Sequence, residues 1–278
     1  MQVEIRRQAE ILWQEVFGDN EIFIKRLFDL YYDDKHFYSI SHNGYLKVML
    51  FILDYKLLIG GKEYKGAYLY GFCSKPEYRK QGLGKRLLSQ TEQRLRKSDF
   101  DFIFLIAANN RLIDYYKDLS FVPCNSHQWK EWHEIRQEQI PVSNYSFEIS
   151  KQIPEKSYHA LSSKKQDRVL HTAKDLSLYE NTDYDIFCMY IGKEICALAV
   201  VKSSDEERIV LDVVSESCES EIILLNHIST LSTQRLLVPC MQIADANAES
   251  ASPYMIKSLS DKENIVPQHL FFNLLLDK

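Results

Sequence analysis

A loop with two glycines, set between an uncharged stretch and an amphipathic one, most constrains how this chain folds. Residues 66–74, GAYLYGFCS, carry no charge and predict an interior strand. The loop lies in Pro76–Leu88, PEYRKQGLGKRLL, and a helix is predicted after it by apolar spacing at Leu83, Leu87, Thr91 and Leu95. The most apolar run follows at 100–108, FDFIFLIAA, and predicts a central strand. Helices that alternate with strands in this way predict an α/β fold.

The rest of the first half continues the alternation of helices and strands. Asp19 or Asn20 is placed to cap the second helix, because a short polar side chain accepts the free amides of a first turn. Predicted elements are helices at 3–17 and 20–32, a hairpin of strands at 36–40 and 45–53, a helix at 112–119 and a strand from 121–123. We therefore expect an α+β mixed sheet covered by helices on both faces.

Composition and charge narrow the functional classes. A chain of 278 residues with net charge −5 has room for two domains and lacks the basic excess of a nucleic-acid binder. Its six cysteines form no C-x-x-C pair, which indicates reduced thiols. The N-terminus predicts an amphipathic helix, not a signal peptide, and Val48–Leu53 is too short to span a bilayer. His127 and His133 are too loosely spaced for a metal pair, so no metal site is expected. Together these features lead us to expect a cytoplasmic protein without a membrane or nucleic-acid partner.

The glycine loop has the properties of an anion site. Backbone amides at a helix N-terminus lack partners and lie at the positive end of the helix dipole. Gly82 and Gly84 allow close backbone approach, and cations surround them: Arg79, Lys80, Lys85 and Arg86. A diphosphate suits such a loop. The dinucleotide fingerprint fails because Leu87 replaces its third glycine, and the P-loop pattern fails too, so a plain helix start remains the alternative.

Two motifs together resemble the GNAT (GCN5-related) acyl-CoA N-acyltransferases. Arg79, Gly82 and Gly84 fill the [QR]-x-x-G-x-[GA] pattern of motif A. Downstream, NNRLIDYYKDLSF resembles motif B, with matching positions at Asn109, Tyr116 and Phe121. Ser120 departs from the glycine that usually precedes this phenylalanine. The resemblance covers residues 1 to about 125, and its most specific part is 66–122.

The resemblance implies acetyl-CoA as acyl donor. The amides of 80–85 would hold its pyrophosphate, and the strand at Phe72 and Cys73 would pair with the pantetheine. An amide near Phe72 or Cys73 would polarise the thioester carbonyl. The cofactor-binding residues implied are Phe72, Cys73, Arg79, Lys80, Gln81, Gly82, Leu83, Gly84, Lys85 and Asn109.

Tyr116 is the candidate general acid that protonates the departing CoA thiolate. The alternative role for Tyr116 is core packing, and Tyr115 lies about 100° away around the predicted helix. Cys73 invites a nucleophile interpretation, although no histidine is near in sequence and a buried packing thiol is the simpler role.

The general base is not identified by the motifs. Either ordered water takes the proton of the attacking amine, or a carboxylate from the acceptor side does. The carboxylates considered are Glu21, Asp33 and Asp34.

The second half repeats the order of strands, helix and strand without the loop. Residues 126–150 show little periodicity and predict a joint. Beyond it we expect a helix at 154–179, strands at 184–191, 194–201 and 208–215, a helix at 219–231 and strands at 235–242 and 269–277. The stretch SESCESE, from Ser215, has acidic residues and no glycine where an anion would bind. We therefore expect a GNAT domain at 1–130 and a degenerate GNAT-like domain at 145–278, a layout similar to the Eis-type branch.

Three functions remain open on these residues. The first is acetyl transfer from CoA to a small-molecule or protein amine. The second is a non-catalytic acyl-CoA-binding regulatory module, suggested by Ser120 and by the missing base. The third is an aminoacyl transferase that uses charged tRNA, against which the acidic balance counts. Neither the acceptor nor the oligomeric state follows from the sequence, and an oligomer is possible.

Overall fold

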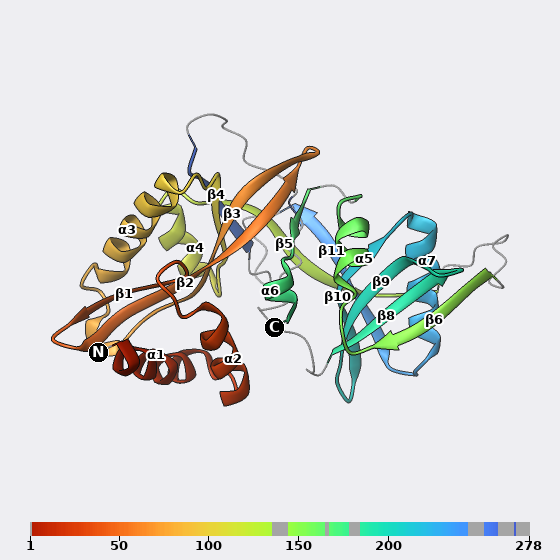
Figure 1. Cartoon of the computed structure of the whole chain (residues 1–278), viewed down its shortest axis with the longest axis horizontal. Helices are drawn as coiled ribbons and strands as arrows, with labels where there is room; N and C mark the ends of the chain where they lie inside the picture. The colour runs from red at the N-terminus through yellow and green to blue at the C-terminus, as the bar shows by residue number, and fades with distance from the viewer. Residues whose placement is uncertain are drawn as a thin grey trace. The chain divides into compact units, whose positions relative to one another are not determined.

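The computed structural model describes residues 2–134, 144–164, 167–177, 184–243, 253–260 and 270. The chain divides into two compact units (Figure 1). Unit 1 comprises Met1–Leu57, Glu63–Pro123 and Tyr254–Val266, and unit 2 comprises Leu58–Lys62, Cys124–Pro253 and Pro267–Lys278. Within the described ranges, no helix combines the length and apolar composition that a membrane span requires.

Unit 1 is a mixed sheet with helices on both faces, as the sequence predicts. Its strands lie in the order β1 (Phe37–His42), β2 (Tyr45–Ile59), β3 (Lys62–Ser74), β4 (Phe102–Ile106) and β12 (Pro253–Ser258). Figure 1 shows α1 (Gln2–Phe17) and α2 (Glu21–Tyr31) on one face and α3 (Leu83–Lys97) and α4 (Asn110–Lys117) on the other. The Asn20 side chain accepts from the Phe23 amide, so Asn20 is the residue that caps α2.

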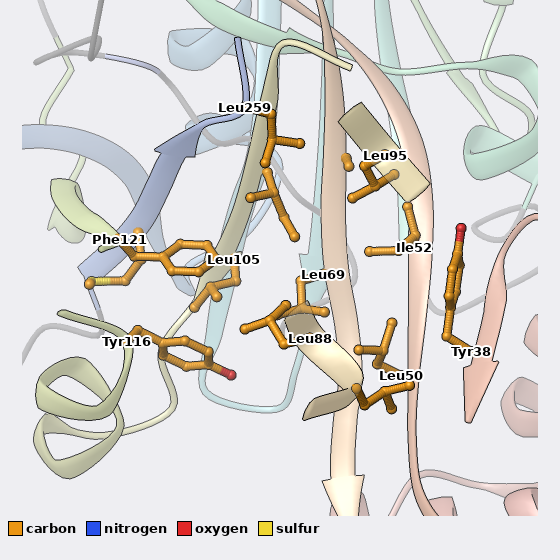
Figure 2. Packing of buried hydrophobic residues seen from close by; sticks show 14 of the residues in the cluster. Tyr38, Leu50, Ile52, Leu69, Leu88, Leu95, Leu105, Tyr116, Phe121 and Leu259 are labelled. Atoms are coloured by element: carbon orange, nitrogen blue, oxygen red, sulfur yellow. The ribbon is translucent and has the colours of Figure 1, made fainter. Parts of the chain in front are cut away.

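The core of unit 1 joins α3 and α4 to the sheet. Figure 2 shows Tyr116 and Phe121 at one side of this cluster and Tyr38 at the other, with aliphatic side chains between them. Leu87, Thr91 and Leu95 of the predicted α3 stripe are buried. Met255 and Leu259, from the C-terminal part of the chain, belong to the same cluster.

The central strands β3 and β4 separate, and this separation positions the site. They pair in parallel only from Gly66 and Phe102 to Tyr68 and Phe104, whereas β3 continues to Ser74. The backbone of β3 beyond Tyr68 therefore has no partner in β4.

Unit 2 has its own mixed sheet. The strands lie in the order β5 (Val122–Glu131), β11 (Arg235–Ile243), β10 (Glu207–Ser215), β9 (Glu194–Ser203), β8 (Tyr184–Ile191) and β6 (Tyr145–Ser150). β8, β9 and β10 pair antiparallel, whereas β10 and β11 are parallel and are connected by α7 (Cys218–Thr230). This repeats the parallel pair β3 and β4 that α3 connects in unit 1.

Three predictions for the second half need correction or lie outside the description. The predicted joint at 126–150 contains the end of β5 and all of β6. The single helix predicted at 154–179 is wrong, because α5 (Glu155–Ser162), β7 (Arg168–Leu170) and α6 (Ala173–Leu176) occupy that range. The predicted strand at 269–277 lies outside the described residues except for Leu270.

A buried ion pair explains why that helix is interrupted. Arg168 is 2% exposed and Asp212 is 1% exposed, and the guanidinium donates to both carboxylate oxygens at 2.7 and 2.9 Å. The Tyr158 hydroxyl donates to the same carboxylate at 2.5 Å. The short extended segment β7 thus places the Arg168 guanidinium beside the Asp212 carboxylate of β10.

We predict that Asp212→Asn destabilises unit 2 by about 3–5 kcal/mol, because it removes the carboxylate to which the buried Arg168 guanidinium donates. Urea unfolding followed by hydrogen exchange of β10 amides measures this loss. The control is Asp185→Asn, which removes the exposed pair of Lys151 and Asp185 and costs about 0–1 kcal/mol. Equal losses in the two variants would contradict the buried-pair account.

Candidate functional site

The site starts from a kink in β3. Gly71 has a φ of +60°, a left-handed conformation inside a strand. The Trp13 ring of α1 lies directly against it, so a Cβ added at Gly71 would lie 2.0 Å from the ring atom Cζ3. Trp13 is itself held by its indole N–H, which donates to Asp19 at 2.7 Å, and by an edge contact with Tyr70. Only glycine fits at this position of the strand.

The glycine loop follows β3 and begins α3. Gly82 precedes the helix with φ 75° and ψ 0°, and its carbonyl accepts the first helical bond, from the Arg86 amide at 3.0 Å. No side chain caps the helix. Within the described part of the chain, the amides of Leu83, Gly84 and Lys85 have no hydrogen-bond acceptor. These amides are available to an anion.

The second glycine of the loop allows a close contact. A Cβ at Gly84 would lie 3.1 Å from the Phe72 ring and 3.6 Å from the Tyr115 hydroxyl oxygen. The first turn of α3 therefore packs against the end of β3 and against α4. Gly84 thus lies between the side chains of Phe72 and Tyr115.

A cavity of about 860 Å³ lies where β3 and β4 separate. It is lined by most of the predicted site residues, namely Phe72, Cys73, Arg79, Lys80, Gly82, Gly84, Lys85, Asn109 and Tyr116. The cavity is also lined by residues that the sequence does not predict as site residues: Val16, Ser74, Tyr78, Arg111, Leu112 and Tyr115. Arg111 follows Asn109 of the motif B match by two residues, and this proximity is the one sequence signal for it.

Two predicted cofactor-binding residues do not line the cavity with their side chains. Gln81 is exposed and donates to the Glu77 carbonyl at 2.9 Å. Leu83 packs into the core. Any contact of these two residues with a ligand in the cavity would come from the backbone.

Asn109 has a structural role at the edge of the cavity. Its carboxamide oxygen accepts from the Leu112 amide at 3.1 Å and so caps α4. The NH2 group of the same side chain is the part that a ligand in the cavity could contact.

Tyr116 is buried, with 6% of its surface exposed, and it still lines the cavity. Burial raises the pKa of its phenol above the ordinary value of 10, and the neighbouring Tyr115 raises it further. The phenol is therefore protonated throughout the neutral pH range and can donate a proton. The ring contacts Phe121 at a centroid distance of 5.5 Å, so packing and proton donation are compatible (Figure 2).

The departure at Ser120 leaves the turn intact. Ser120 has a φ of +67°, the conformation that glycine usually supplies. The Phe121 amide donates to the Tyr116 carbonyl at 3.0 Å and closes the end of α4. Ser120 therefore keeps the geometry of the turn at a cost in backbone strain.

Cys73 lacks the properties of a nucleophile. Burial raises the pKa of its thiol to about 12, although the nearby Arg79 acts in the opposite direction. The thiol is therefore protonated at neutral pH.

The carboxylates considered as bases lie elsewhere. Asp33 and Asp34 line a different cavity beside β1, where the Asp33 carboxylate contacts the His36 ring at 2.7 Å. Glu21 is exposed in the first turn of α2. None of the three lines the cavity that contains Tyr116. Among the described residues, no group of three His, Cys, Asp or Glu side chains is placed to hold a metal ion.

Comparison with known proteins agrees with this geometry. Residues 4–122 match the family model described as an acetyltransferase (GNAT) domain. No curated protein sequence matches the chain significantly.

Solved structures similar to this chain include three bacterial proteins. A GCN5-related N-acetyltransferase from Kribbella flavida has a TM-score of 0.74 and 12% identity, over 92% of this chain and 69% of that one. A probable N-acyltransferase from Enterococcus faecalis has a TM-score of 0.73 and 12% identity, over 93% and 71%. Eis1 from Mycobacterium abscessus has a TM-score of 0.70 and 12% identity, over 91% and 71%. At these identities the likeness establishes the fold.

We predict that Gly71→Ala destabilises unit 1 by at least about 2 kcal/mol, from left-handed strain and from overlap with Trp13. Gly44→Ala is the matched control, because Gly44 has a φ of +79° and nothing within 4 Å. The difference in urea unfolding free energy isolates the Trp13 contact. Equal losses would mean that Trp13 does not fix the kink.

Proposed function

Through residues 4–122 the chain belongs to the GNAT acetyltransferases, and we propose that it transfers the acetyl group of acetyl-CoA to a primary amine. The observation that carries the proposal is one cavity lined both by the glycine loop, whose free amides begin α3, and by the protonated Tyr116 phenol. The amides suit the diphosphate of acetyl-CoA, and the phenol suits its leaving thiolate.

The diphosphate end combines backbone and side-chain charge. The amides at the start of α3 lie at the positive end of the helix dipole. Four cationic side chains line the same cavity: Arg79, Lys80, Lys85 and Arg111. Arg79 is oriented by its own bond to the Ser74 carbonyl at 3.2 Å, which holds it beside the end of β3. The loop thus offers neutralisation of charge without a metal ion.

The thioester end uses the free edge of β3. Beyond Tyr68 this strand lacks a β4 partner, so the amides and carbonyls on that side are available to an extended pantetheine arm. We assign the amide near Phe72 or Cys73 to the thioester carbonyl, where it would stabilise negative charge that develops on oxygen. The kink at Gly71 immediately precedes these residues and sets their direction.

Tyr116 acts as the general acid in this proposal. The amine nitrogen forms a bond to the acetyl carbon, the carbon–sulfur bond breaks, and the sulfur takes up the phenolic proton. The phenolate is then reprotonated from solvent or by the proton that the amine has lost. Because burial raises its pKa, the Tyr116 phenol holds its proton until the thiolate departs.

The amine proton is proposed to leave through ordered water. The cavity walls, within the described residues, carry no carboxylate, and Glu21, Asp33 and Asp34 do not line them. This favours water over these three side chains as the proton acceptor. Val16, at the end of α1, is the one described wall residue from the first two helices.

Unit 2 is proposed to be a GNAT-like unit without the anion site. Its strand order and parallel crossover repeat those of unit 1. At the start of α7, however, the Ser217 side chain caps the helix by accepting from the Ser220 amide at 3.1 Å. Glu219 and Glu221 occupy the first turn and would repel a phosphate. In this proposal, unit 2 therefore does not bind acetyl-CoA and is non-catalytic.

We predict that Gly82→Asp weakens acetyl-CoA binding at least about tenfold, because a carboxylate would lie where the diphosphate binds. Gly82→Asn is the matched control, since asparagine has nearly the same shape, tolerates left-handed φ and carries no charge. The site is open, with nothing within 4 Å of an added Cβ, so neither variant clashes. Calorimetric titration of acetyl-CoA measures the affinities.

Binding that is lost in the Asp variant and kept in the Asn variant supports the charge argument. If acetyl-CoA binds all three proteins equally, its diphosphate does not lie on this loop. If it binds none of them, including the wild type, the loop is only a helix start and the proposed function is wrong.

We predict that Tyr116→Phe lowers turnover about 10²–10⁴-fold and leaves acetyl-CoA affinity unchanged, because only the departing thiolate needs the proton. Release of CoA thiol from acetyl-CoA, with the best acceptor from an amine screen, measures turnover. Tyr115→Phe is the control, as it removes the neighbouring phenol from the same cavity and leaves the acid in place.

Turnover of the Tyr116→Phe variant at the wild-type rate would assign Tyr116 to packing. The pH profile adds a second readout. Because the Tyr116 pKa is raised above 10, the wild-type rate should not fall from phenol ionisation between pH 7 and about 10. Acetyl-CoA binding without turnover for any amine would favour the regulatory module.

A further inference from the structure

Strand β1 forms an open edge of the unit 1 sheet. The strand order begins with β1, which pairs with β2 on one side only. An edge strand presents a row of backbone groups that can pair with another extended chain. β1 spans about 20 Å at roughly 3.3 Å per residue, which is enough to pair with a short peptide.

The direction of the free backbone groups follows from two bonds. The His36 carbonyl accepts from the Ile52 amide of β2 at 2.8 Å, and the Phe37 amide points away from β2 and donates to the Asp33 carbonyl at 2.9 Å. Because these directions alternate along an antiparallel strand, Ser39 also faces the open edge. The bulge after Ile40 places its extra residue, Lys47, in β2, so the alternation continues along β1 and Ser41 faces the open edge as well. Within the described ranges, no backbone group accepts from or donates to the outward groups of Ser39.

A cavity of about 870 Å³ runs along this edge. Phe37, Ser39 and Ser41, the residues whose backbone faces outward, all line it. One wall is α3, with Leu87, Gln90 and Arg94, and the other is formed by Ile5 and the turn after α2, with Tyr32, Asp33 and Asp34. The edge is therefore the floor of a groove and not a flat rim.

Charged side chains line the groove near the start of β1. Arg94 lies over the Tyr38 ring at 4.8 Å and donates to the Asp34 carbonyl at 3.2 Å, which holds its side chain against the wall. Asp33 and Asp34 are both exposed, but the Asp33 carboxylate contacts the His36 ring at 2.7 Å. Among the described residues, the Asp34 carboxylate is therefore the one that a basic side chain of a ligand would meet.

We propose that β1 docks an extended basic peptide of a partner protein, which adds to the sheet as a further strand. Its main chain pairs with Ser39 and Ser41, and alternate side chains meet the two walls. An apolar side chain packs on Leu87, and a lysine or arginine pairs with Asp34. This surface shares no lining residue with the Tyr116 cavity, so the inference stands independently of the acetyl-transfer proposal.

A peptide fits this groove better than a second copy of the chain does. A second β1 would bring its own α3 and its own turn after α2 to the same narrow space. A single strand carries no such walls. The acidic end also favours a basic partner, whereas the corresponding end of a second copy is equally acidic.

The test uses a fluorescein-labelled octapeptide that alternates valine with lysine, added to the full chain without acetyl-CoA. Ser39→Pro removes the outward amide and leaves the bonds to β2 intact. Ser39→Ala is its control, because it keeps that amide. Fluorescence anisotropy measures peptide affinity, and acetyl-CoA titration of both Ser39 variants, expected to match the wild type, confirms that the site is folded.

We expect Ser39→Pro to weaken peptide binding about tenfold, from the lost main-chain bond and the steric bulk of the ring. Ser39→Ala should match the wild type. Asp34→Asn should weaken binding about two- to fivefold, whereas Glu206→Gln, at an exposed carboxylate of unit 2, should not. A peptide N-methylated on alternate amides should not bind, and the valine–glutamate peptide should bind more weakly than the lysine peptide.

Three results would overturn the proposal. The first is equal peptide affinity for Ser39→Pro and Ser39→Ala, which would mean that β1 is not the binding strand. The second is no binding of the lysine peptide to the wild type. The third is a dimer by sedimentation that Ser39→Pro dissociates, which would assign the edge to a second copy of the chain.

Discussion

The contact between the Trp13 ring and Gly71 is the constraint on which the site depends. It fixes α1 against the sheet and holds β3 in a left-handed kink that another residue could not adopt without displacing the ring. Beyond Tyr68, β3 and β4 no longer pair, and the cavity lies in the space that this separation leaves. The packing interaction between α1 and β3 thus lies within the segment of β3 that the proposed chemistry uses. The same contact explains why α1 contributes Val16 to the cavity wall.

The two units differ in charge and in capping at the start of the helix that connects their parallel strands. In unit 1 the first turn of α3 has free amides, no capping side chain and four cations around the cavity. In unit 2 the equivalent helix α7 is capped by Ser217 and carries Glu219 and Glu221 in its first turn. Two units with a similar strand order therefore differ at the one place where an anion would bind.

Local patterns predicted the glycine loop and the start of α3 because the geometry of both is local. The loop and the α3 stripe depend on residues within a few positions of one another. Where partners are distant in sequence, prediction failed. Strand β12 was missed because its identity comes from pairing with β4, and the helix predicted at 154–179 was wrong because Arg168 must reach Asp212. Arg111 and Tyr115 were missed as cavity residues because only the contact of α4 with α3 brings them there.

In the proposed complex, one molecule of acetyl-CoA spans the glycine loop and the free end of β3. Hydrogen exchange followed by mass spectrometry measures this, with acetyl-CoA compared against acetyl-pantetheine, which lacks the diphosphate. We expect both ligands to slow exchange at residues 72–74 and only acetyl-CoA to slow exchange at 80–85. Protection confined to unit 2, or none at either segment with saturating acetyl-CoA, would contradict it.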